Sequence, residues 1–129
     1  MESIKQNIEA ETLKMVTALD WHSIIIDMEV ELRGRAPKNY FVDSSVAVCI
    51  CKMDGVLTDH DLDLSKEYRE LFYRLYELSD TKWGSCRIII FRGQIPDWHF
   101  TLPPSKRLDR LSDNEVDELI EKLLVSVKP

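Results

Sequence analysis

The stretch HSIIIDMEVELR, residues 22–33, constrains the fold more than any other part of the chain. Apolar side chains recur at every second position, which is the period of a β-strand with one buried face. These apolar positions are Ile24, Ile26, Met28, Val30 and Leu32. Between them stand Asp27, Glu29 and Glu31, which strand alternation places together on the other face. Carboxylates are poor strand formers and repel one another, so we expect their face to lie outside the core.

Helix and strand patterns alternate along the rest of the chain. Amphipathic helices are predicted at 3–19, 65–79 and 113–127, and strands at 23–32, 41–52, 86–93 and 97–102. The order α-β-β-α-β-β-α is typical of an α+β fold. We therefore predict a single domain over residues 1–129. It has one antiparallel sheet, with the helices packed on the face that carries Ile24 and Ile26.

Composition narrows the classes of function. The formal net charge of −6 disfavours direct binding to nucleic acid, which needs a basic surface, and suits a basic partner. No apolar run has the length of a membrane span, and the N-terminus lacks a signal-peptide pattern. The three cysteines sit in apolar runs, as free thiols do in a reducing compartment. We expect a cytoplasmic protein without a membrane partner.

The acidic run DHDLDL, residues 59–64, invites comparison with a calcium-binding loop. Asp59, Asp61, Asp63 and Glu70 occupy positions 1, 3, 5 and 12 of that template. Position 6 requires glycine for a sharp turn, and this chain has Leu64 there. Acidic residues before a helix also complement its dipole, so we expect no calcium site.

The cysteines are the next candidates for a metal site or a catalytic nucleophile. Cys49 and Cys51 share a strand face, and with Cys86 and His99 they could form a tetrahedral zinc site. Their apolar neighbours favour packing in the core instead. A nucleophilic cysteine paired with a histidine is conceivable, but no catalytic signature surrounds Cys86. We expect no metal, no cofactor and no catalytic residue.

Three tryptophans, Trp21, Trp83 and Trp98, lie within or at the start of predicted strands. The favoured interpretation is that each anchors the core. Trp98 is the candidate for exposure as an interface anchor, because tryptophan often supplies binding energy at protein interfaces.

The order of elements and the placing of aromatic residues resemble the YezG-like immunity proteins. The resemblance covers residues 8–102 and is a pattern rather than a sharp motif. The residues that carry it are Trp21, Leu71, Leu75-Tyr76-Glu77-Leu78, Trp83, Ile88, Ile90, Gly93 and Phe100. After Gly93 the chain departs from the family, which usually continues there with an acidic, tyrosine-rich strand.

This resemblance implies a bacterial immunity protein of a polymorphic or contact-dependent toxin system. Such a protein neutralises a cognate toxin domain, often a nuclease, by binding it in the cytoplasm. An acidic surface would mimic the phosphates that a nuclease binds. The expected toxin-binding residues are Asp27, Glu29, Glu31, Asp59, Asp61, Asp63 and Trp98. The alternative is a non-catalytic adaptor or subunit with a solvated acidic face, and a small Cys/His hydrolase is less favoured.

Overall fold

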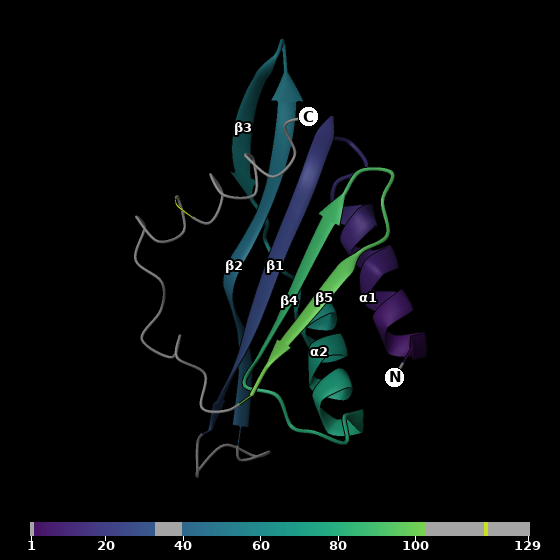
Figure 1. Cartoon of the computed structure of the whole chain (residues 1–129), viewed down its shortest axis with the longest axis vertical. Coiled ribbons are helices and arrows are strands. Elements are labelled where there is room, and N and C mark those ends of the chain that lie inside the picture. The colour runs from purple at the N-terminus through teal and green to yellow at the C-terminus, as the bar shows by residue number, and fades with distance from the viewer. Residues whose placement is uncertain (1, 33–39, 103–117, 119–129) are drawn as a thin grey trace.

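The structure, a computed structural model, describes residues 2–32, 40–102 and 118. Within them, five strands form one antiparallel sheet in the order β3-β2-β1-β4-β5 (Figure 1). The elements are α1 (Glu2–Met15), β1 (Trp21–Leu32), β2 (Tyr40–Met53), β3 (Val56–Asp61), α2 (Lys66–Leu78), β4 (Ser85–Phe91) and β5 (Asp97–Thr101). The predicted α+β class with one antiparallel sheet is confirmed. The predicted helix at 113–127 lies outside the described residues.

Strand β3 was not predicted from the sequence. The sequence pattern places only residues 59–61, the second half of this strand, in an acidic run that precedes a helix, and it predicts no strand for residues 56–61. Instead they fold back on β2 through the turn at Asp54 and Gly55, both of which have positive φ values, of 52° and 78°. This left-handed pair is the geometry that closes a tight β-hairpin. The hairpin extends the sheet by one strand and makes β3 an edge strand.

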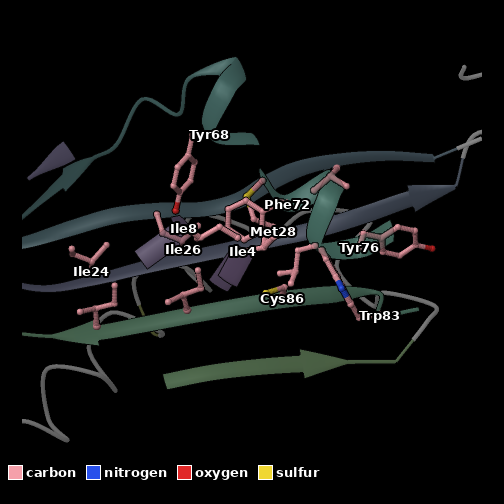
Figure 2. Packing of buried hydrophobic residues seen from close by; sticks show 14 of the residues in the cluster. Ile4, Ile8, Ile24, Ile26, Met28, Tyr68, Phe72, Tyr76, Trp83 and Cys86 are labelled. Atoms are coloured by element: carbon pink, nitrogen blue, oxygen red, sulfur yellow. The ribbon is translucent and has the colours of Figure 1, made fainter. Parts of the chain in front are cut away.

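Both described helices pack on one face of the sheet, which we call the helix face (Figure 1). Ile24, Ile26 and Met28 of β1 have no exposed surface there. Figure 2 shows Ile8 of α1 and Phe72 of α2 beside Ile26 and Met28. The predicted packing of the first two helices on this face is confirmed.

A buried polar contact joins the two helices. The hydroxyl of Thr12 on α1 donates to the backbone oxygen of Ile8 at 2.6 Å and lies 2.7 Å from the hydroxyl of Tyr68 on α2. Burial raises the pKa of Tyr68 far above its ordinary value, so this residue stays a neutral phenol. Because each hydroxyl has a partner, the helices meet without an unsatisfied polar group at this point.

The other face of the sheet, which we call the distal face, is also buried at its centre. Ile25 of β1 has no exposed surface, and its partner on β2, Val48, is only 3% exposed. Ile50 is buried on the same face of β2. The expectation that the distal face lies outside the core is therefore wrong for these two strands. The alternation along β1 was predicted correctly, but alternation distinguishes two faces and does not show which of them meets water.

Candidate protein-binding surface

The three carboxylates of β1 do not form the exposed acidic surface that we expected. Asp27 has no exposed surface and Glu29 is 8% exposed, whereas Glu31, near the end of the strand, is exposed. Both residues lie on β1, the central strand of the sheet, where Asp27 is paired with Val46 of β2 and Glu29 with Asp43. The prediction of an exposed three-carboxylate face is therefore wrong for two of its three members.

Asp27 has a structural role that the sequence analysis missed. The guanidinium Nε of Arg87 on β4 donates to Asp27 Oδ2 at 2.9 Å, and the two residues are direct partners across the β1–β4 pairing. The arginine side chain is 19% exposed. A buried carboxylate needs such a partner, because transfer of an isolated charge from water into the interior is very costly. The sequence signal was an arginine inside the otherwise apolar strand CRIIIF.

A second group of predicted residues is exposed. Asp59 and Asp61 are exposed on the edge strand β3, and Asp63 is exposed in the segment that leads to α2. We call these three residues the acidic edge. Asp59 and Asp61 are two positions apart on one strand, so both project to the same side of the sheet. This part of the predicted toxin-binding surface is therefore accessible to a partner.

The charge around the acidic edge is strongly negative. The segment 54–70 contains six carboxylates and two basic residues. One of the basic residues, Arg69, is 3.8 Å from Asp43 of β2, measured from its Nη1 to Oδ1. Charged side chains on an edge strand also discourage pairing with other chains. The acidic edge therefore favours recognition by a positively charged surface over recognition by a bare strand.

The tryptophans divide between core and periphery. Trp83 is buried, as predicted for a core anchor, while Trp21 and Trp98 are half-buried. The indole N–H of Trp98 donates to Glu9 Oε2 at 2.8 Å, and the ammonium of Lys5 lies 5.5 Å from its ring centroid. Trp98 thus contacts α1 from β5, and only part of its surface remains for a partner.

The cysteine thiols are poorly placed for nucleophilic chemistry. Cys49, Cys51 and Cys86 are all free and buried. Burial raises the pKa of Cys49 to about 12. The pKa of Cys86 is also raised, mainly by burial and to a smaller extent by the negative charge of Asp27. The reactive thiolates of Cys49 and Cys86 are therefore scarce near neutral pH. That the protein is not an enzyme stays a prediction.

The surface of the described residues is hollowed between α1 and α2 and again at the end of β5. A cleft of about 430 Å³ lies between α1 and α2, and its lining includes Glu11 and Glu67. A groove of about 320 Å³ lies at the end of β5. We call it the β5 groove, and it is lined by Ser79, Asp80, Thr81, Trp83, Phe100, Thr101 and Leu102. Neither hollow could be predicted from the sequence, since each joins segments that are distant along the chain.

Within residues 2–32 and 40–102, no group of three or more His, Cys, Asp or Glu side chains is arranged to hold a metal ion. The side chains of His60 and His99, on the two edge strands, are exposed. The expected absence of metal and cofactor stays a prediction for the protein as a whole.

No known protein family matches the chain, and no curated protein matches it. The resemblance to the YezG-like immunity proteins therefore remains a prediction from the sequence. Among the helices that the structure describes, none has both the length and the apolar character needed to cross a membrane.

Proposed function

We propose that this chain is an immunity protein that binds and neutralises a basic toxin domain, a nuclease, in the cytoplasm. The observation that carries the proposal is the exposure of Asp59, Asp61 and Asp63 together at one edge of a rigid sheet. Free cysteines, which persist in a reducing compartment, support the cytoplasmic location. The order of helices and strands supports the immunity class through its resemblance to YezG-like proteins.

The acidic edge suits a partner that binds nucleic acid. Alternate residues of a strand lie about 6.5–7 Å apart, which is close to the spacing of phosphates along a nucleic-acid strand. Asp59 and Asp61 have this relation on β3. A nuclease that grips a phosphate backbone presents a basic cleft, so these carboxylates would occupy the position of its substrate.

The rigidity of the acidic edge matters for affinity. β3 pairs with β2 over six residue pairs, from Val48–Asp61 to Met53–Val56, so the backbone that carries Asp59 and Asp61 is fixed before binding. A fixed backbone loses little conformational entropy when the partner docks. Exposed ion pairs contribute only about 0–1 kcal/mol each. The affinity must therefore come from carboxylates that lose water at the centre of the interface, where truncation of a charge costs about 2–5 kcal/mol.

The test is the variant Asp59→Asn/Asp61→Asn, which keeps the shape of both side chains and removes their charge. The proposal predicts that a basic toxin domain is encoded beside this chain. The variant should be measured against that domain, by calorimetry and by survival of cells that express it. We expect the affinity to fall at least about 100-fold, because two desolvated charges are lost. Protection should be lost with it, and the association rate should depend less on salt.

The matched control is Glu2→Lys, an exposed residue of α1. Both variants change the net charge from −6 to −4, so a difference between them reports position rather than total charge. Among the described residues, Glu2 makes a 3.7 Å surface contact with Lys5, and its replacement should alter neither folding nor protection. Full protection by the Asp59→Asn/Asp61→Asn variant would exclude the acidic edge as the toxin-binding surface.

A further inference from the structure

The two edges of the sheet differ in how they are protected. Edge strand β3 carries exposed Asp59 and Asp61, which discourage pairing with another strand. Edge strand β5, DWHFT, has one charged residue, Asp97, and among the described strands it pairs only with β4. Exposed apolar residues adjoin both of its ends: Ile95 precedes it and Leu102, 70% exposed, follows it. Among the described residues no further strand pairs with this edge, and a free strand edge is a template for an added strand.

The β5 groove lies beside this edge and has the composition of a binding hot spot. Buried Trp83 lines it together with Phe100, which is 36% exposed, and Leu102. The rings of Trp83 and Phe100 are 5.9 Å apart, so the aromatic wall is held in place. Ser79, Asp80 and Thr81 add polar groups to the lining. Apolar anchors with polar neighbours of this kind are typical of the sites that bind a single large side chain at an interface.

We propose that β5 and the β5 groove bind an extended polypeptide segment of another protein. The segment pairs with β5 as an additional strand, and one of its aromatic or large aliphatic side chains enters the groove. Phe100 projects to the helix face, so a neighbouring strand directs every second side chain toward the same face. Asp80 favours a lysine or arginine next to the anchor side chain. This site is on the edge opposite β3 and does not rest on the proposed function.

A second copy of the chain fits this edge poorly. The bond from Trp98 to Glu9 and the position of Lys5 over the rings of Trp98 and Phe100 hold α1 against β5 (Figure 1). Two β5 strands paired about a two-fold axis would be about 4.8 Å apart. The two α1 helices would then be brought together on one face, although packed helices need about 8–10 Å between their axes. A lone extended segment brings no helix with it.

The experiment uses the full chain and the blocked peptide acetyl-Thr-Lys-Trp-Thr-Val-amide, followed by amide chemical shifts. We expect saturable shifts at β5 and at the indole of Trp83. Replacing the peptide's tryptophan with serine should weaken binding at least about tenfold, because the anchor is lost. Two further peptides carry N-methyl groups at positions 2 and 4, or at 1, 3 and 5. Since a strand pairs through one of its edges, only one of these two should lose affinity.

Matched variants of the protein complete the test. Leu102→Ser, in the groove, should weaken the parent peptide at least about fivefold, whereas Leu78→Ser, an exposed leucine outside the groove, should change it less than about twofold. Absence of saturable shifts, equal binding of both N-methylated peptides, or equal effects of the two leucine variants would each overturn the proposal. A dimer in sedimentation that Leu102→Ser dissociates would also overturn it, by making a second copy the occupant.

Discussion

Replacement of Arg87 with methionine should destabilise the protein by about 3–5 kcal/mol, the range for breaking a buried ion pair by removing one partner. Methionine keeps most of the length and the apolar stem of arginine, so the loss reports the charge and its hydrogen bond. Asp27 has no exposed surface and would keep its carboxylate in the sheet without the guanidinium that now lies 2.9 Å away. The measurement is the free energy of unfolding in urea, compared with the parent protein.

The chain supplies a matched control for this prediction. Lys14 and Glu11 on α1 also have a 2.9 Å ion pair, but their side chains are 70% and 46% exposed. Lys14→Met should therefore cost less than about 1 kcal/mol, because water solvates the remaining carboxylate. Similar losses in the two variants would show that the Asp27–Arg87 pair is solvated. A double variant, Asp27→Asn/Arg87→Met, should recover part of the loss, since the buried charge is then removed as well.

Much of the fold could be predicted because apolar residues recur in the sequence with the period of a strand or of a helix. The two-residue period of β1 and the helical period of α2 follow directly from which side chains contact the helix face. β3 could not be predicted in this way, since its acidic residues lack an apolar stripe and its register comes from the hairpin turn at Asp54 and Gly55. The position of β3 is therefore set by the geometry of the turn and not by an apolar residue pattern.

The candidate site could be predicted only in part, for a related reason. The sequence does not show whether a carboxylate is buried or exposed. Asp27 is buried beside Arg87, whereas Asp59 and Asp61 are exposed on an edge strand. Depth depends on strand order, which places β1 in the centre of the sheet and β3 at its margin. The β5 groove was beyond prediction, because Trp83 and Leu102 meet only through tertiary structure.

Ile25→Ala should cost about 2–4 kcal/mol in the free energy of unfolding, close to the loss for Ile26→Ala. These neighbours on β1 project to opposite faces of the sheet, and neither has any exposed surface. Each substitution removes the same atoms from a closed environment, so the transfer and cavity contributions should be similar. Urea unfolding of both variants, with Ile89→Ala as a half-buried comparison on the distal face, measures them.

The pair Ile25→Ala and Ile26→Ala also decides where a partner can dock. If Ile25→Ala costs less than about 1 kcal/mol while Ile26→Ala costs its full amount, the distal face is open to water. Asp27, Glu29 and Glu31 would then form the continuous acidic surface that the sequence predicts. If the two losses are equal, the centre of the distal face is closed, and Asp27 and Glu29 serve the fold. In that case a basic partner has to be met by carboxylates at the margin of the sheet, and the acidic edge on β3 supplies them.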